Sequence, residues 1–555
     1  MESHAKVAVS IHRATDGPGD GEVSRRRWPI RRHWIPYTDD GVAFAAALVS
    51  VAAFAIYLRT MMPSTGFWDT GEAQTVPATL SIFHPTGFPL YALVGWAWSH
   101  LPLGDSVAWR MNLLSGISIA MAAGLVTLIT GHLVLERNRL LRAVAAGIGG
   151  ASFAFAAEPW ENAGRADIHA INVFFVALIV WLLFAWAAAV RVRSPRSGRW
   201  LVAAALAFGL GIAAHPLVGL TAVGIAGWLL IVDRHLWRRW RLVSVCAAMI
   251  AIGIAAYGYI WVRAVVTPAP PLFYAHPNTW ENFRYLVFAE QFSHLFENFE
   301  SPLAQLASKW TGAERVLAAQ FPVVGWLLIA LGASVLAVRR WPALVLLGLI
   351  AVANVFYAMN FRDGDIDRYY LPTVVVTAPL IGVAIAAIAD TVAGAVADAS
   401  VRLVATRAAQ RRVAAAAAGL VLALGVLLPA TSLATGYRAQ DRSQNREADA
   451  WVESVYAQLP PNAVIISWWS YSTPLWYHRW VLGERPDVTI IDERNILDDG
   501  YRTMRNAIRT YYGERPVYVV PPDWDYRRIT DVWETRTVST YPGYIDLLLI
   551  EGLRQ

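Results

Sequence analysis

Eleven apolar segments dominate residues 41–434 and constrain the fold most strongly. A transmembrane α-helix needs about 20 apolar residues, with a range of about 17–25. Segments 143–157 and 200–214 are short for a full crossing, and 87–101, which contains Pro89, is predicted to be interfacial or re-entrant. The predicted helices cover 41–61, 108–134, 143–157, 170–190, 200–214, 216–232, 242–262, 322–338, 341–358, 371–389 and 413–434. We therefore expect a mainly α-helical, polytopic membrane protein with about eleven transmembrane helices.

Composition supports this class. Only 16% of residues are charged and the mean hydropathy is +0.40, whereas soluble chains carry about 25% charge. The single cysteine, Cys246, excludes a disulfide framework and a CxxC site. Of 47 basic residues only Lys6 and Lys309 are lysines, which we interpret as the codon bias of a GC-rich, bacterial genome. Residues 1–40 lack the features of a signal peptide and are expected to form a flexible tail.

Basic residues are distributed unevenly between the two sides of the predicted helices. With the N-terminus in the cytoplasm, the cytoplasmic segments carry 24 Lys and Arg residues and the outer loops carry 7. Cytoplasmic loops are normally the positive ones. The net charge of +6 therefore reflects topology in a plasma (inner) membrane, and no nucleic-acid partner is expected. An odd number of crossings places the outer loops 62–107 and 263–321, and the C-terminal segment, outside the cytoplasm.

The C-terminal segment 436–555 differs in composition from the transmembrane domain, 41–435. Short apolar runs at 463–469, 487–492 and 516–520 alternate with helix-like stretches at 445–458 and 500–512. This pattern predicts a small extracytoplasmic α/β domain.

Polar residues with catalytic chemistry gather in the predicted outer loops. The first loop holds Asp69, Glu72 and His84, and no Lys or Arg. A carboxylate near a membrane surface is costly unless it has a function or a partner. The spacing of Asp69 and Glu72 fits a helix capping box, and it also fits two carboxylates on one helix face, one of them a general base. Both interpretations remain open from the local pattern.

Further candidates come from the other outer loops, each with a structural alternative. Arg165 in the loop around 158–169 favours a surface ion pair, His215 can simply cap a helix, and Arg263 can either snorkel to the interface or bind a lipid phosphate. The loop 359–372 begins like a calcium loop but has Val374 where that motif needs a glutamate. These loops contribute Glu158, Asp167, His169, His215, Arg263, Asp367, Arg368 and Tyr369.

Several motifs identify a family. The run 69-DTGEAQTVPATLSIFHPTGFPLYALVG-95 with 110-RMNLLSG-116 resembles the signature of the transmembrane O-mannosyltransferase-like family of the GT-C glycosyltransferase superfamily. Thr86 stands where that family has a second proline, and 468-WWSYST-473 replaces a segment that is often acidic. Further similar stretches are 157-AEPWENAGRADIHAIN-172, His215, 259-YIWVRA-264, 280-WENFRYLVFAEQF-292, 367-DRYYLP-372 and 474-PLWYHRWVLGERPDVTIID-492.

The resemblance implies a GT-C fold, a polyprenyl-phosphate sugar donor and a catalytic aspartate at Asp69. Glu72, His84 and Arg110 also match motif positions. The implied reaction is an inverting displacement, in which Asp69 takes the proton of an acceptor hydroxyl while Arg263, with His84 or His169, stabilises the leaving phosphate. No cofactor is required by this chemistry. A divalent metal bound by the acidic first loop, with His84, His169 and His215 as further candidate ligands, is the less favoured alternative.

The resemblance leaves the substrates open. Mannose is the sugar expected from the family, with arabinose, glucose and galactose as alternatives, and the acceptor is a protein, a glycan or a lipid of the cell envelope. A transporter or flippase of lipid-linked sugars is a second hypothesis, although transporters place ionisable groups near the bilayer midplane and the predicted helix centres here lack them. A non-catalytic subunit of an envelope complex is the third.

Overall fold

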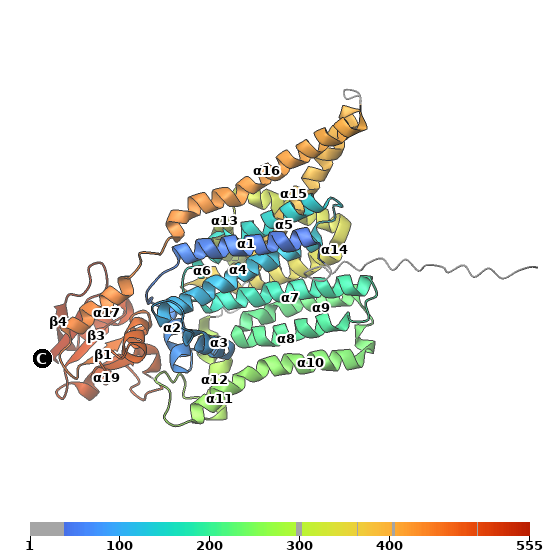
Figure 1. Cartoon of the computed structure of the whole chain (residues 1–555). Helices are drawn as coiled ribbons and strands as arrows, with labels where there is room; N and C mark the ends of the chain where they lie inside the picture. The colour runs from blue at the N-terminus through green and yellow to red at the C-terminus, as the bar shows by residue number, and fades with distance from the viewer. Residues whose placement is uncertain (1–37, 296–301, 363, 402–405, 497, 555) are drawn as a thin grey trace, which may run out of the picture.

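The computed structural model describes residues 38–295, 302–362, 364–401, 406–496 and 498–554. A bundle of long helices carries a small α/β domain at one end (Figure 1). We call the end of the bundle that carries this domain the domain end. The predicted tail 1–40 lies almost wholly outside the described residues, and its cytoplasmic location stays a prediction.

Seven helical stretches in the described ranges are long and apolar enough to cross a membrane. Helices α5 (Arg139–Ala154) and α6 (Ala157–Ala163) meet at 66° and form an eighth span if they are counted together. The shorter α8 (Gly198–Ala214) and the pair η1 (Pro216–Leu220) and α9 (Thr221–Val232) complete the bundle. The seven are α1 (Asp40–Thr60), α4 (Val107–Leu133), α7 (Ile168–Arg191), α10 to α11 (Trp240–Val265), α14 (Val323–Met359), η5 with α15 (Ile366–Ser400) and α16 (Arg407–Gln440).

Helix α14 consists of two arms that meet at Arg340, whose φ of −154° and ψ of 46° are not helical. Pro342 follows and cannot donate a backbone hydrogen bond. Arg340 contacts the carbonyl of His132 at the C-terminal end of α4, whereas Asn360, just past α14, pairs with Lys309 at the domain end. The two arms correspond to the predicted helices 322–338 and 341–358, and all eleven predicted segments are helical.

Burial separates central from peripheral helices. In the most apolar window of each helix, 83% of the residues of α4 and 89% of those of α15 are buried within the protein, against 28% for α1 and 22% for α16. Helices α4 and α15 therefore form the centre of the bundle, and α1 and α16 present apolar side chains outward. Figure 1 shows the ends of α15 and α16 extending beyond the other helices.

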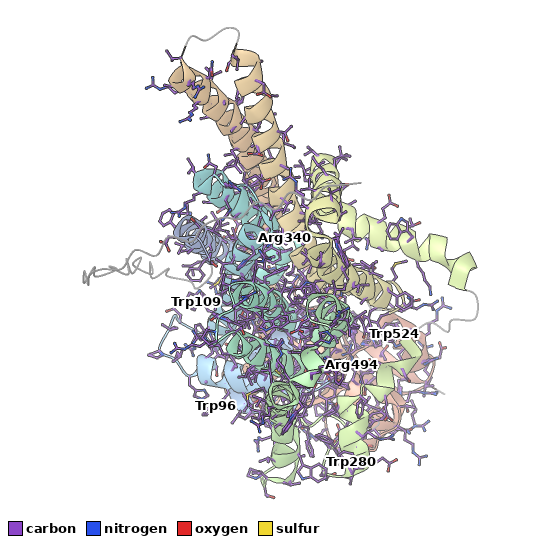
Figure 2. The ribbon with its side chains drawn as sticks, turned by 90° about the vertical axis from the view of Figure 1, so that its right-hand side faces the viewer. Trp96, Trp109, Trp280, Arg340, Arg494 and Trp524 are labelled. Atoms are coloured by element: carbon purple, nitrogen blue, oxygen red, sulfur yellow. The ribbon has the colours of Figure 1, made fainter. Side chains whose placement is uncertain are left out.

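The segments between the spans form short helices at the domain end. Helix α2 (Asp69–Thr79) begins at Asp69, and α3 (Pro89–Ser99) lies in the segment predicted to be interfacial or re-entrant. Proline suits the first turn of a helix, which explains why α3 begins at Pro89. Between α11 (Gly258–Val265) and α14 lie α12 (Trp280–Val287), η4 (Glu290–Leu295) and α13 (Pro302–Gln320). Trp280 lies at the edge of the molecule (Figure 2).

The C-terminal domain has a five-stranded sheet in the order β2-β1-β3-β5-β4. The strands β1 (Val464–Ser467), β2 (Thr489–Asp492) and β3 (Val517–Val520) are parallel and match the three predicted runs. Strands β5 (Leu547–Leu553) and β4 (Trp533–Val538) extend the sheet antiparallel to β3 and were not predicted. Its helices are α17 (Glu447–Gln458), α18 (Trp469–Trp476), η6 (Tyr477–Val481), η7 (Glu493–Asn495), α19 (Met504–Tyr511) and α20 (Asp523–Thr530).

The C-terminal domain packs directly on α2. A Cβ atom at Gly71 would lie 2.5 Å from the carbonyl oxygen of Gly66 and 2.9 Å from the carbonyl carbon of Thr473 in α18. Only glycine allows this approach without a backbone shift. The indole of Trp469 belongs to the same hydrophobic core as the bundle helices, and the Tyr477 hydroxyl accepts a hydrogen bond from the Ala108 amide at 2.9 Å.

Candidate functional site

Helix α2 positions both predicted catalytic carboxylates. Trp68 is the N-cap of α2 and makes no capping hydrogen bond with its side chain, and Asp69 is the first helical residue. The capping-box geometry, with Asp69 as N-cap, is therefore not formed. Its carboxylate instead accepts hydrogen bonds from two distant segments of the chain.

Asp69 lies between Arg368 and Trp469. Its Oδ2 accepts a hydrogen bond from Arg368 Nη2 at 2.5 Å, and its Oδ1 accepts one from Trp469 Nε1 at 3.0 Å. Burial alone would raise the pKa of Asp69, but the charge of Arg368, aided by two other nearby cationic groups, holds that pKa well below its usual range. The side chain is 20% exposed, so a substrate can reach a carboxylate that stays ionised.

Glu72 is fully buried one turn further along α2 and pairs with His84. The Glu72 carboxylate accepts a hydrogen bond from the His84 backbone N–H at 2.9 Å and contacts the His84 Nδ1 atom. Burial raises the pKa of Glu72, and the adjacent His84 ring opposes that rise. The contact to Nδ1 orients the ring and leaves its Nε2 atom for another partner.

Arg368 joins three acidic residues. Besides Asp69, its guanidinium contacts Asp167 Oδ2 at 3.2 Å and Asp365 Oδ2 at 3.5 Å. Arg368 and Asp167 are buried, and Asp167 also caps α7 by accepting from the His169 N–H at 2.7 Å. Within the described residues, Nε of Arg368 is buried with no hydrogen-bond partner. The guanidinium therefore retains donor capacity for an anionic group.

A group of rings lies beside this ion-pair cluster. The centroids of the His169 and His215 rings are 4.4 Å apart, and that of Tyr369 is 4.9 Å from His169. His215 stacks on Phe88 at 5.1 Å, and its Nδ1 accepts from the Leu217 N–H. The helix-capping role considered for His215 is thus present, and the ring also lines the site. Within the described residues, the buried Nδ1 atom of His169 has no hydrogen-bond partner.

The C-terminal domain contributes residues that sequence reasoning missed. Arg494 lies 4.1 Å from the centroid of the Trp469 ring, a cation–π distance. Tyr274, from the segment between α11 and α12, packs edge to face against the Trp469 ring, with the ring centroids 5.7 Å apart. Asp492 ends β2, and burial raises its pKa to about 7. The sequence signals in this region were the run 468-WWSYST-473, noted only as replacing an often acidic segment, and the family-like stretch 474–492.

Four predicted site residues make their contacts with groups other than Asp69. Arg110 donates to the Ser99 and Leu103 carbonyls, and Arg263 donates to the Leu80 carbonyl at 2.6 Å, at the C-terminal end of α2. Glu158 contacts Gln320 and Asn162. Asp367 forms an ion pair with Arg315. Asp363, the first acid of the calcium-like run, lies outside the described residues.

One group of side chains in the described ranges has metal-ligand geometry. Asp69, Glu72 and His84 each offer a ligand atom, and these atoms lie within 4.8 Å of one another. Two carboxylates and an imidazole suit several divalent cations. However, Arg368 already neutralises Asp69, so a cation would have to displace or share this contact. The group lies in the acidic first loop considered from the sequence and includes His84, but not His169 or His215.

Comparison with known proteins shows what the chain is similar to. A family model described as the "Protein O-mannosyl-transferase TMEM260 N-terminal domain" matches residues 69–239, beginning at Asp69. The chain is 25% identical over 481 residues to mouse "Protein O-mannosyl-transferase TMEM260", covering 82% of this chain and 63% of that protein. A Dictyostelium discoideum protein of the same name is 25% identical over 38% of this chain and 26% of its own length. The chain thus spans less than two thirds of these relatives.

Solved structures share the fold at low sequence identity. ArnT from Cupriavidus metallidurans in the apo state has a TM-score of 0.54 and 15% identity, covering 92% of this chain and 98% of that one. The same protein bound to undecaprenyl phosphate has a TM-score of 0.52 with 92% and 97% coverage. An Archaeoglobus fulgidus oligosaccharyltransferase tethered with an acceptor peptide has a TM-score of 0.51 and 14% identity, with 91% and 74% coverage. The chain is therefore similar in sequence to the O-mannosyl-transferase TMEM260 relatives, and it shares the fold of ArnT and of the oligosaccharyltransferase.

Proposed function

We propose that this protein is a membrane glycosyltransferase that transfers mannose from a polyprenyl-phosphate donor to an acceptor hydroxyl on the extracytoplasmic side. Asp69 is the general base. The names of the relatives support the sugar and the reaction class. The undecaprenyl phosphate bound to ArnT, which shares the fold, supports a lipid phosphate as the carrier.

The observation that carries the proposal is the position of the Asp69 carboxylate between Arg368 and Trp469. Its two hydrogen bonds occupy one acceptor site on each oxygen, and a carboxylate has about four such sites. An acceptor hydroxyl can therefore donate to Asp69 while both contacts persist. The low pKa keeps Asp69 ionised across the working pH range, as a base requires.

The reaction is a single displacement at the anomeric carbon. The proton of the acceptor hydroxyl passes to Asp69 as the acceptor oxygen forms a bond to that carbon. The carbon–oxygen bond to the lipid phosphate breaks, and its electron pair stays on the phosphate oxygen. Attack from the face opposite to the phosphate inverts the configuration.

Arg368 links the base to the leaving group in this proposal. A carboxylate with a low pKa is a weak base, because base strength follows pKa. A donor phosphate near Arg368 would compete with Asp69 for the guanidinium, whose Nε is still unpaired in the described part of the chain. As Arg368 turns towards the phosphate, Asp69 regains basicity and the leaving group gains a charge-assisted hydrogen bond.

His84 is a second donor to the phosphate in this proposal. Its Nδ1 is engaged by Glu72, so Nε2 is the atom that can donate to a phosphate oxygen. A phosphate monoester is a good leaving group, and Arg368 already supplies positive charge. We therefore propose that the reaction needs no metal, and expect full transfer in the presence of EDTA.

The test is sugar transfer by the purified full chain in lipid, with a panel of radiolabelled polyprenyl-phosphate sugars and an extract of envelope acceptors. We expect label from the mannosyl donor to reach an acceptor with the native protein and with Asp523→Asn, a control at an exposed aspartate of α20. Transfer of a different sugar would show that the donor carries that sugar and not mannose. Donor binding with no transfer, together with movement of the lipid-linked sugar across vesicles, would establish the transporter hypothesis instead.

A further inference from the structure

Three arginines meet at the end of the bundle opposite the domain end. Arg142 in α5, Arg191 at the end of α7 and Arg340 at the kink of α14 line one pocket with a volume of about 240 Å³. His132, in the last turn of α4, also lines it. We call this the arginine pocket. Figure 2, which views the bundle from this end, shows Arg340 among the helix ends.

The arginine pocket lies far from the proposed catalytic site. Helix α7 connects the two, because Asp167 caps its first turn beside Arg368 and Arg191 ends its last turn. A helix of 24 residues is about 36 Å long at a rise of 1.5 Å per residue. The pocket therefore belongs to the opposite membrane surface.

The positive charge of the pocket is not compensated by the described residues. Arg142, Arg191 and Arg340 are close enough to repel one another. In the described ranges none of the three has a carboxylate within ion-pair distance, and the only acid in the lining, Asp39, pairs with Arg139 at 3.3 Å. The neighbouring Arg339, by contrast, pairs with Glu136 at 2.9 Å. The described residues therefore leave the positive charge of the pocket uncompensated.

Donor groups in the lining also lack partners. Arg142 Nη2 donates to the Glu136 carbonyl at 2.6 Å, but Arg142 Nε is buried without a hydrogen bond in the described structure. The same holds for Nε2 of His132 and the hydroxyl of Thr38. Buried polar atoms are normally satisfied, so these groups point to an anionic ligand that accepts several hydrogen bonds.

We propose that the arginine pocket binds a phosphate group. A guanidinium binds phosphate with paired, charge-assisted hydrogen bonds, so three arginines suit this group. The volume is below the roughly 300–1,000 Å³ of pockets that enclose drug-sized ligands, so it suits a phosphate head and not a nucleotide sugar. Anionic phospholipid of the adjacent leaflet and free phosphate are the two sources of this chemistry.

The experiment uses the full chain purified in detergent. Native mass spectrometry counts bound phosphatidylglycerol, with phosphatidylcholine as a lipid of zero net charge, and a separate titration measures the thermal shift caused by inorganic phosphate. We expect Arg142→Gln with Arg340→Gln to weaken anion binding at least tenfold. Arg196→Gln, an exposed arginine outside the pocket, is the matched control and should bind as the native protein does.

The outcomes separate the sources. Selective retention of phosphatidylglycerol without a shift from phosphate identifies the lipid, and a shift from phosphate alone identifies a soluble ion. If the double variant does not fold, Arg191→Gln at an exposed helix end carries the test, with the same expected direction. Equal anion binding by the native protein and these variants would overturn the proposal.

Discussion

The indole N–H of Trp469 donates a hydrogen bond to Asp69 Oδ1 at 3.0 Å, across 400 positions of the sequence. Trp469 begins α18 of the C-terminal domain, and Asp69 begins α2 at the end of the bundle. The C-terminal domain is thus in contact with the proposed catalytic base. It is therefore part of the candidate site and does more than cover it.

Trp469→Phe should shift the pH dependence of transfer. Phenylalanine keeps the ring beside Arg494 but removes the N–H donor, and the pKa of Asp69 rises as a result. A hydrogen bond to a charged group contributes about 1.5–3 kcal/mol, which corresponds to a rise of roughly one to two pH units. The native pKa of Asp69 lies well below its usual range, so kcat/KM of the native protein should be flat from about pH 5 upwards.

The measurement is the acid limb of kcat/KM, followed below pH 5, which should appear at higher pH in Trp469→Phe than in the native protein. Trp524→Phe, at an exposed tryptophan of α20, is the control. Superimposable profiles for all three proteins would contradict the role given to this hydrogen bond.

Arg368→Gln should lower the stability of the fold as well as the rate of transfer. The substitution leaves Asp69 and the buried Asp167 without their cationic partner, and breaking a buried ion pair costs about 3–5 kcal/mol. Arg315→Gln removes an exposed ion pair with Asp367 and should cost less than about 1 kcal/mol. Thermal unfolding in detergent compares the two. Equal unfolding temperatures would show that Arg368 is not needed to hold this cluster.

Hydropathy predicts the bundle well because the signal is local. Each of the eleven apolar segments becomes a helix, and the interruption 339-RRWP-342 marks the kink between the arms of α14. The parallel strands β1 and β3 are fully buried and β2 is partly buried, and their short apolar runs are visible in the sequence. Strand β4 consists mostly of polar residues, with only Trp533 buried, so the sequence shows no apolar run there.

The candidate site is predictable only in part. Asp69, Glu72 and His84 stand in one continuous motif, and the structure brings them together. The sequence favoured Arg263 as the phosphate ligand, but Arg263 contacts the Leu80 carbonyl and Arg368 is the arginine that contacts Asp69. Nothing local in the sequence distinguishes these two arginines. Trp469 and Arg494 reach the site through the docking of a separate domain, which periodicity does not encode.

Gly71→Ala should loosen the contact between α2 and the C-terminal domain. The added Cβ meets backbone atoms of Gly66 and Thr473, which cannot move aside as side-chain ends do. We expect faster amide exchange in α18 and a loss of transfer of at least tenfold, because the hydrogen bond from Trp469 to Asp69 depends on this packing. Gly219→Ala, where a Cβ has no neighbour within 4 Å, should leave both unchanged. If the amides of α18 exchange at the native rate in Gly71→Ala, the two segments are not tightly packed at this glycine.

His478 should make the stability of the C-terminal domain depend on pH. Its ring contacts Asp449 at 3.2 Å and Glu484 at 2.8 Å. Burial alone would lower the pKa of His478, but the two carboxylates outweigh burial and raise it. A raised folded pKa means that the contribution is fully present below the unfolded pKa of about 6.5 and is lost as pH rises through the folded value.

Thermal unfolding of the full chain between pH 6 and 9 measures this effect. The unfolding temperature of the C-terminal domain should fall as pH rises in the native protein, and His478→Gln should reduce the slope. His235→Gln, in an exposed turn at the far end of the bundle, is the control. A slope that His478→Gln leaves intact would assign the pH dependence to other groups.

The most direct test of the central claim is the rate of transfer by Asp69→Asn at saturating donor. Asparagine keeps the size of the side chain but cannot take a proton, so we predict a loss of about 10²- to 10⁴-fold or more in kcat. Donor binding and the folded state, measured in parallel, should be retained. Transfer by Asp69→Asn at the native rate would contradict the assignment of Asp69 as the base.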